Sequence, residues 1–480
     1  MTLGTKEIYT DIPFERGIYC NRTLNLRSIK AIGYDMDYTL VHYNVEAWEG
    51  RAYEHIKQRL LAVGWPVEDL HFDPQWVARG LIIDVKLGNI VKANRFGYIW
   101  RAAHGMEVLS YAAMKKAYSR ILVDLNESRY IFLNTFFSIS AGCMYSQLVD
   151  LLDRGVLPEV LGYHDLYNRV QDLLDAAHIE GELKAEIMAT PERYVDLDPQ
   201  MPLTLLDQRE AGKKMIVITN SEWEYTRFML EYAFDAFLPG DMTWRELFHL
   251  IVVSARKPAF FSQSGPIFKV VTEQGLLSPW IGPLEEGGIY LGGNAAVIED
   301  FLGMSGDEIL YVGDHLFADV NVTKNVLRWR TALVVRELEE EIHAISLASE
   351  RQDQIHALMM EKVALEDLFS QARLQLQRRQ GGYGPPLEEN QDPKELSSRI
   401  AELRRELVKI DARIGPLVIQ DGTDFNPTWG YLMRSGNDKS HLTRQVERYA
   451  DIYMSRVSNF LRYTPFMFFR AQRGILPHDY

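Results

Sequence analysis

Short apolar runs that end in polar residues recur along this 480-residue chain. Four of them lie at residues 29–34, 215–218, 250–253 and 309–312. Runs of this length, rich in β-branched residues, predict buried parallel strands, and parallel strands are typical of α/β folds. We therefore expect an α/β protein in which the polar residues after each run gather at the carboxyl edge of one sheet.

The first apolar run ends in two carboxylates, Asp35 and Asp37, with one residue between them. A carboxylate at this edge can act as a nucleophile toward phosphorus, and a second one beside it can act as acid and base. Taken alone, the pair also fits a helix cap and a turn.

The second and third runs end in residues that suit a phosphoryl group. Thr219, Asn220 and Ser221 follow the second run, and their hydroxyl and amide groups can hold phosphoryl oxygens. Lys257 follows the third run and supplies a positive charge. In isolation Thr219 also fits a simple helix cap, and Lys257 fits a solvated loop lysine.

The fourth run ends in a second pair of acids, Asp314 and Asp319. Carboxylates in such a pair suit a hard cation such as Mg²⁺, although they also fit surface acids on a loop and a first helical turn. The order along the chain is nucleophile, threonine, lysine and acid pair. This set predicts phosphoryl transfer, in which Mg²⁺ and Lys257 offset the repulsion between Asp35 and a phosphate dianion.

These motifs resemble the haloacid dehalogenase superfamily and, more closely, the cytosolic purine 5'-nucleotidases, which prefer IMP and GMP. Matching segments run from residues 21–24 and 33–40 to residues 449–453 and 469–471, so the resemblance covers nearly the whole chain. It implies a Rossmann-like core with a large inserted cap domain, and hydrolysis through an aspartyl-phosphate on Asp35. It also implies Mg²⁺ ligands at Asp35, Asp314 and the backbone carbonyl of Asp37. Asp319 would orient a water ligand of the ion or Lys257.

The spacing between the first two motifs locates the cap. Asp35 and Thr219 are 184 residues apart, far more than one crossover connection needs. Within this insertion, residues 170–184 resemble the substrate-reading helix of the family and the turn after it, with Lys184 at the phosphate. The resemblance places the base and ribose contacts at Phe137, Ser138, Gln171, Asp175 and His178.

Two features of the cap leave alternatives open. Gln171 stands where the family has an arginine, so the base contacts and the base preference are open. Without the resemblance, Phe137 also fits an ordinary core aromatic. Asp175 and His178 likewise fit an exposed helix face.

A heptad-like seam marks the C-terminal third of the chain. Apolar residues recur every three or four positions at Leu396, Ile400, Leu403, Leu407, Ile410 and Ile414, and a similar rhythm runs through residues 355–376, where Lys362 interrupts it. Glycines and prolines in residues 381–386 break the helix between the two seams. The pattern predicts an antiparallel helical hairpin, either packed on itself or serving as a partner or self-association arm.

Together these features predict five segments. Residues 1–45 begin the core, residues 46–200 form the cap, residues 201–345 continue the core, residues 346–416 form the hairpin, and residues 417–480 pack on the core.

Composition adds limits. The net charge of −14 argues against a nucleic-acid partner, and only Cys20 and Cys143 are present, which favours a reducing compartment. No apolar signal core opens the chain and the apolar stretches have strand length, so we expect no membrane span and a cytoplasmic location. We also expect a homo-oligomer, a dimer or a tetramer. The alternatives are a phosphatase or phosphotransferase for another small phosphoester, and a non-catalytic scaffold that uses the hairpin.

Overall fold

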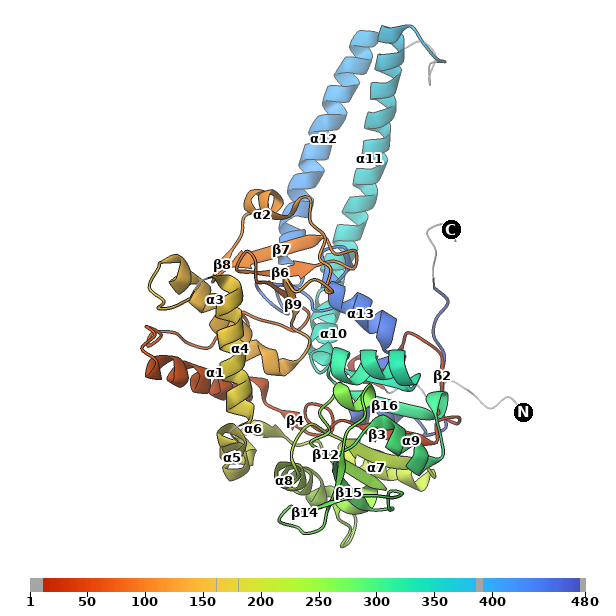
Figure 1. Ribbon diagram of the computed structural model, residues 1–480. Helices are drawn as coiled ribbons and strands as arrows, with labels where there is room; N and C mark the ends of the chain where they lie inside the picture. The colour runs from red at the N-terminus through yellow and green to blue at the C-terminus, as the bar shows by residue number, and fades with distance from the viewer. Residues whose placement is uncertain (1–11, 161, 180, 386–391, 475–480) are drawn as a thin grey trace, which may run out of the picture. The chain divides into compact units, whose positions relative to one another are not determined.

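The computed structural model describes residues 12–160, 162–179, 181–385 and 392–474. The chain divides into two compact units, Met1–Glu339 with Leu432–Tyr480, and Glu340–Tyr431 (Figure 1). The first unit contains the sheet that carries the polar motifs, and the second contains two long helices.

A ten-stranded sheet forms the centre of the first unit, in the order β1-β20-β17-β16-β3-β11-β12-β15-β13-β14. The strands from β20 to β15 run parallel, and antiparallel strands flank them at both edges. Their bounds are β1 (Ile18–Cys20), β3 (Ala31–Tyr34), β11 (Lys214–Ile218), β12 (Leu250–Val253), β13 (Ile267–Val270), β14 (Leu277–Pro279), β15 (Gly288–Gly292), β16 (Ile309–Gly313), β17 (Arg330–Val334) and β20 (Ile452–Met454). The predicted α/β fold with a parallel, Rossmann-like core is confirmed.

The four apolar runs of the sequence are the four central neighbours β16, β3, β11 and β12. Tyr34 at the end of β3 pairs with Val217 of β11 on one side and with Val312 of β16 on the other. The three strands therefore end side by side, and the residues after them meet at one edge of the sheet. β3 and β16 are buried at every position and β11 at every position after Lys214, which explains why these stretches are apolar.

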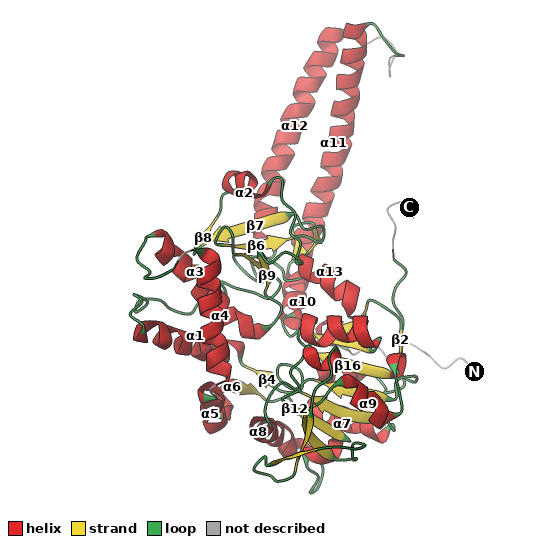
Figure 2. Cartoon of the chain, in the orientation of Figure 1, coloured by secondary structure: helices red, strands yellow, loops and turns green. Residues whose placement is uncertain are grey.

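Helices cover this sheet, as Figure 2 shows in red against the yellow strands. They are α7 (Gln200–Glu210), α8 (Trp223–Phe234), α9 (Ala295–Leu302) and α13 (His441–Tyr449). A further helix, α10 (Leu338–Leu347), begins in this unit and belongs mostly to the second. Between sheet and helices lies a core cluster that includes Ile216, Val252, Phe261, Tyr311 and Trp329. Two short ribbons complete this part of the chain, β2 (Leu24–Asn25) with β21 (Phe468–Phe469) and β18 (Arg434–Ser435) with β19 (Asp438–Lys439).

The cap is inserted after β3, between two short strands that pair with each other. The chain leaves the core at β4 (His42–Tyr43) and returns at β10 (Val195–Asp196). The insertion contains a five-stranded sheet in the order β8-β7-β6-β5-β9. Its elements are β5 (Ile82–Asp84), β6 (Asn89–Ala93), β7 (Ile99–His104), β8 (Glu107–Val108), β9 (Tyr130–Phe132), α1 (Val45–Ala62), α2 (Tyr111–Tyr118), α3 (Ile139–Asp153), α4 (Tyr163–Ile179), α5 (Glu182–Ala189) and α6 (Pro191–Tyr194). The predicted cap insertion is confirmed.

The second unit contains the helical hairpin of α11 (Ser349–Gly381) and α12 (Pro393–Gln420). α12 begins with a capping box at Asp392 and a proline in its first turn. Leu358 of α11 packs with Ile410 and Ile414 of α12, as the seam predicts. Lys362, which interrupts the seam, forms an ion pair with Asp411 across the hairpin at 2.7 Å. The predicted hairpin is confirmed, whereas the boundaries of the five segments stay a prediction.

None of the helices in the described residues combines the length and the hydropathy that a membrane crossing requires. The cytoplasmic location stays a prediction.

Candidate active site

Three buried carboxylates converge at the carboxyl edge of the central strands. Asp35 directly follows β3, and its amide donates to the carbonyl of Val312 at 2.9 Å. Asp314 directly follows β16, and Asp319 lies in the π-helical turn Leu316–Asn321 that comes next. Oxygen atoms of Asp35, Asp314 and Asp319 lie within 4.8 Å of one another. The structure therefore brings together the first and fourth motifs of the sequence.

Lys257 connects two of these acids. Its Nζ lies 2.7 Å from Oδ1 of Asp35 and 2.8 Å from Oδ1 of Asp319, and it donates to the hydroxyl of Tyr311 at 3.2 Å. Burial alone would lower the pKa of Lys257, but the two carboxylates raise it well above its ordinary value. The side chain is thus a buried ammonium that offsets part of the acidic charge.

The side chain of Asn220 holds the loop that carries this lysine. Its Oδ1 accepts from the amide of Lys257 at 2.6 Å, and its Nδ2 donates to the carbonyl of Lys257 at 3.1 Å. Two hydrogen bonds to the backbone of this one residue fix the position from which the lysine side chain reaches the acids.

Lys257 does not neutralise all three carboxylates of the cluster. Burial raises the pKa of Asp35 to about 7, with a further rise from Asp319 and an opposing effect of Lys257. Burial also raises the pKa of Asp314 well above its ordinary value, and the neighbouring Asp35 and Asp319 add to this. Oδ2 of Asp314 is buried without a hydrogen-bond partner among the described residues. Three clustered carboxylates with one free oxygen fit a hard divalent cation, which takes oxygen ligands and favours the ionised form of each acid.

Asp37 is hydrogen-bonded at both carboxylate oxygens. The hydroxyl of Tyr43 donates to Oδ1 at 2.6 Å, and Oγ of Ser221 donates to Oδ2 at 2.7 Å. Burial raises the pKa of Asp37, while the positive charge of Lys184 lowers it. Thr219, fully buried at the end of β11, accepts from the amide of Ser221 through its hydroxyl at 3.0 Å. The second motif of the sequence therefore contacts the second acid of the first motif.

Lys184 reaches this group from α5 of the cap. Its Nζ lies 2.7 Å from Oε2 of Glu222 and 3.3 Å from Oγ of Ser221, and it lies 4.9 Å from the ring centroid of Tyr225. Lys184, one of the predicted cap residues, therefore contacts polar residues at the sheet edge.

The predicted base-binding residues belong to two elements, the turn Phe136–Ser138 and the helix α4. The half-buried Phe137 packs against Tyr38, with ring centroids 4.9 Å apart, and Ser138 precedes α3. Gln171 donates to Oδ1 of Asp175 at 2.8 Å on one face of α4, where Asp175 is exposed. The side chain of His178 lies outside the described part of the chain.

Three tyrosines of the site were not predicted from the sequence. Tyr43 contacts Asp37, Tyr225 contacts Tyr43, and Tyr311 contacts Lys257. Tyr311 stands within an apolar run, where an aromatic residue reads as part of the core. Tyr43 and Tyr225 belong to no motif, and only the fold brings them together.

The fold and this edge of the sheet define a class of protein. A parallel core with an inserted cap, two acids after the first strand, a buried lysine and a further acid pair is the arrangement of phosphoric monoester hydrolases of the haloacid dehalogenase type. A model of the 5' nucleotidase family matches residues 18–480, and the chain belongs to this family.

A curated relative agrees with this assignment. A 5'-nucleotidase domain-containing protein of Dictyostelium discoideum is 23% identical over 474 residues, which cover 96% of this chain and 75% of the relative. The predicted family and the predicted phosphomonoesterase class are confirmed.

Two solved structures are distantly similar to the chain. A β-phosphoglucomutase of Pyrococcus sp. strain ST 04 has a TM-score of 0.31 and 13% identity, and the match covers 64% of this chain and 86% of that one. A predicted phosphoglycolate phosphatase of Haemophilus somnus has a TM-score of 0.27 with the same identity and coverage. Both scores lie below 0.5, so neither structure informs the chemistry of this chain.

Proposed function

We propose that the protein is a Mg²⁺-dependent 5'-nucleotidase that hydrolyses purine nucleoside 5'-monophosphates, IMP and GMP first, to nucleoside and phosphate. The observation that carries the proposal is the placement of Lys257 between Asp35 and Asp319, beside the free carboxylate oxygen of Asp314. A phosphate dianion can approach a carboxylate only where fixed positive charge offsets their repulsion.

In the first half-reaction a carboxylate oxygen of Asp35 forms a bond to phosphorus while the bond from phosphorus to O5' of the ribose breaks. Asp37 gives its proton to O5', so the nucleoside leaves as an alcohol. In the second half-reaction Asp37 takes a proton from water, which attacks the aspartyl-phosphate and releases phosphate and free Asp35. Lys257 offsets charge throughout, and Thr219 with the amides after β11 holds the phosphoryl oxygens.

Asp35, Asp314 and the backbone carbonyl of Asp37 would hold Mg²⁺, with Asp319 beside them. When bound, the ion supplies the positive charge that brings the phosphoryl oxygens and the carboxylates together. Support for this assignment comes from the unpartnered Oδ2 of Asp314 and from the raised pKa values of Asp35 and Asp314, which report a cluster short of positive charge.

For the substrate we propose that Phe137 and Ser138 contact the purine and its ribose, while Gln171 and Asp175 read the edge of the base. His178 is proposed as a further contact of the base or ribose. An ionised Asp175 can only accept, so it suits the N1–H of hypoxanthine or guanine and disfavours adenine. Lys184, already beside Ser221, adds charge at the phosphate.

For partners we propose a homo-oligomer, a dimer or a tetramer, with no nucleic acid and no membrane. Exposed apolar residues on both hairpin helices, Met360, Val363 and Val408, are consistent with a self-association arm. Light scattering coupled to size exclusion measures the mass directly, and a monomer at micromolar concentration would exclude this proposal.

A phosphate-release screen tests the function. IMP, GMP, AMP, CMP, p-nitrophenyl phosphate and sugar phosphates are each assayed with Mg²⁺ and with excess chelator. We expect IMP and GMP to be the best substrates, and we expect phosphate release only in the presence of Mg²⁺. A preference for a sugar phosphate would favour the alternative of a different small phosphoester, and no release from any substrate would favour the scaffold.

A further inference from the structure

The chain enters the cap through the two-residue strand β4, whose side chains point to opposite faces. β4 consists of His42 and Tyr43, which pair with Asp196 and Val195 of the returning strand β10. Successive side chains of a strand point to opposite faces, so His42 and Tyr43 meet different neighbours. Both are buried.

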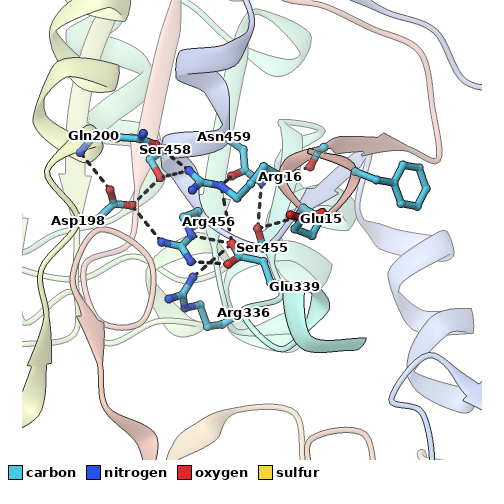
Figure 3. A network of polar contacts seen from close by, with 12 residues as sticks. Glu15, Arg16, Asp198, Gln200, Arg336, Glu339, Ser455, Arg456, Ser458 and Asn459 are labelled. Carbon is cyan, nitrogen blue, oxygen red and sulfur yellow. Dashed lines mark hydrogen bonds and ion pairs between the residues drawn. The ribbon is translucent and has the colours of Figure 1, made fainter. Parts of the chain in front are cut away.

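A network of polar contacts surrounds Asp198, just after the strand by which the chain returns to the core (Figure 3). Burial and the charges of Arg336, Arg456 and Arg16 hold the pKa of His42 well below its ordinary value. Arg456 bonds Glu339 through Nε at 2.6 Å and lies 3.8 Å from Asp198, two residues after β10. The chain is therefore anchored to the core directly after β10.

On the other side, Tyr43 forms a chain of hydroxyl groups that ends at Asp37. The hydroxyl of Tyr225, on α8 of the core, donates to the hydroxyl of Tyr43 at 3.1 Å. The Tyr43 hydroxyl in turn donates to Oδ1 of Asp37 at 2.6 Å. Tyr43 and Tyr225 are 3% and 1% exposed, so water does not compete for these bonds.

The two oxygens of Asp37 thereby have different surroundings. Oδ1 faces a tyrosine whose own proton is directed at it, with a second tyrosine behind. Oδ2 faces Ser221, a hydroxyl that both donates and accepts and that lies at the proposed phosphate site. A proton carried by Asp37 can therefore reside on Oδ2 without displacing the Tyr43 bond.

We propose that Tyr43 is the positioning residue for Asp37: its hydroxyl, held by Tyr225, occupies Oδ1 and leaves Oδ2 as the oxygen that gives a proton to O5' of the leaving nucleoside. This inference rests on the proposed function. The O–H bond at Oδ2 breaks as the O5'–H bond forms, and the negative charge that remains on Asp37 is stabilised by the Tyr43 hydroxyl. The same oxygen takes the proton back from water in the second half-reaction.

Tyr43→Phe tests the proposal because it removes one hydroxyl and little volume. The measurement is kcat/KM, which reports the steps up to departure of the leaving group, for IMP and for p-nitrophenyl phosphate with Mg²⁺. A ribose alkoxide needs the proton and p-nitrophenolate does not. We expect kcat/KM for IMP to fall about tenfold or more and that for p-nitrophenyl phosphate to fall less than about threefold.

Two further variants complete the test. Tyr225→Phe removes only the hydrogen bond from Tyr225 to Tyr43, so kcat/KM for IMP should again fall more than that for p-nitrophenyl phosphate, but by a smaller factor than in Tyr43→Phe. If circular dichroism shows that Tyr43→Phe does not fold, Tyr225→Phe is the variant that tests the proposal. Tyr34→Phe removes a buried hydroxyl bonded to Gln208 and should leave both substrates unchanged.

Equal losses on both substrates, or an unchanged kcat/KM for IMP, would overturn the role of Tyr43 while the hydrolase activity stands. If the wild-type protein hydrolyses neither substrate, the proposed function fails first.

Discussion

Nζ of Lys257 lies 2.7 Å from Oδ1 of Asp35, although the two residues follow different strands of the sheet. The amide of Met36 donates to the same oxygen at 2.7 Å. These two contacts hold Oδ1 from two sides and orient the carboxylate. The proposed nucleophile is thus held before any substrate arrives, which is the condition for rapid attack on phosphorus.

Replacement of Asp37 by asparagine should separate substrates by their leaving groups. Asp37→Asn cannot give a proton, so turnover of IMP should fall about a hundredfold or more. p-Nitrophenyl phosphate should suffer less, because its leaving group needs no acid. The measurement is the ratio of the two kcat/KM values in wild type and variant, and a ratio that does not change would count against Asp37 as the acid.

Removal of the metal should abolish activity. Excess chelator should stop phosphate release and Mg²⁺ should restore it, while Ca²⁺ should support it poorly because it takes more ligands at longer distances. Asp314→Ala should raise the Mg²⁺ concentration needed for half-maximal rate or remove activity. Asp307→Ala, an exposed acid just before β16, is the matched control and should behave as wild type. Full activity in chelator would end the Mg²⁺ assignment.

Lys184→Ala and Asp175→Ala should change kcat/KM for the four nucleotides in different ways. Lys184→Ala should lower kcat/KM about equally for IMP, GMP, AMP and CMP, because every one of them carries the phosphate. Asp175→Ala should narrow a preference of at least about tenfold for IMP over AMP, since an acceptor that a bound base covers and leaves unpaired costs about 1–3 kcal/mol. Asp172→Ala, an exposed acid on the same helix, is the control. If Asp175→Ala leaves the order and spacing of the substrates untouched, Asp175 does not read the base.

Glu49 should make stability depend on pH. It is fully buried on α1, accepts from the amide of Ser140 through Oε2 at 2.9 Å, and its Oε1 has no partner among the described residues. Burial raises its pKa from the ordinary 4.5 to about 7. The folded protein therefore holds a proton that the unfolded chain releases, and the free energy of unfolding falls as the pH rises from about 4.5 to about 7.

Glu49→Gln removes this dependence. We compare the free energy of unfolding of the variant with that of wild type at pH 4 and at pH 8. The difference, variant minus wild type, should increase by on the order of 3 kcal/mol from the lower pH to the higher one. Urea unfolding at both pH values measures the gain, and Glu46→Gln, at an exposed position of the same helix, should show none. A stability difference between Glu49→Gln and wild type that is the same at both pH values would show that burial does not raise the pKa of Glu49.

The sequence allowed the core of the fold to be predicted because buried parallel strands are apolar throughout and end at one edge. The runs at 215–218, 250–253 and 309–312 lie within β11, β12 and β16. The first run was predicted from Ile29, yet β3 begins at Ala31. The carbonyl of Ile29 accepts from Nζ of Lys213 at 2.8 Å, which the pattern of apolar residues does not encode.

The candidate site could be predicted only as far as its motifs follow strands. Asp35 and Asp314 meet because β3 and β16 are neighbours, whereas Lys257 follows β12, which is separated from β3 by β11. Tyr43 and Tyr225 could not be predicted, because the first lies on the ribbon that leads into the cap and the second on a core helix. A contact between two such elements depends on how cap and core pack, and no local pattern reports that.

The most direct test of the central claim is phosphate release from IMP by Asp35→Asn in the presence of Mg²⁺. An amide cannot form the aspartyl-phosphate, so we predict release below detection while circular dichroism and thermal melting show a folded protein. Substantial phosphate release by a well-folded Asp35→Asn protein would contradict the account.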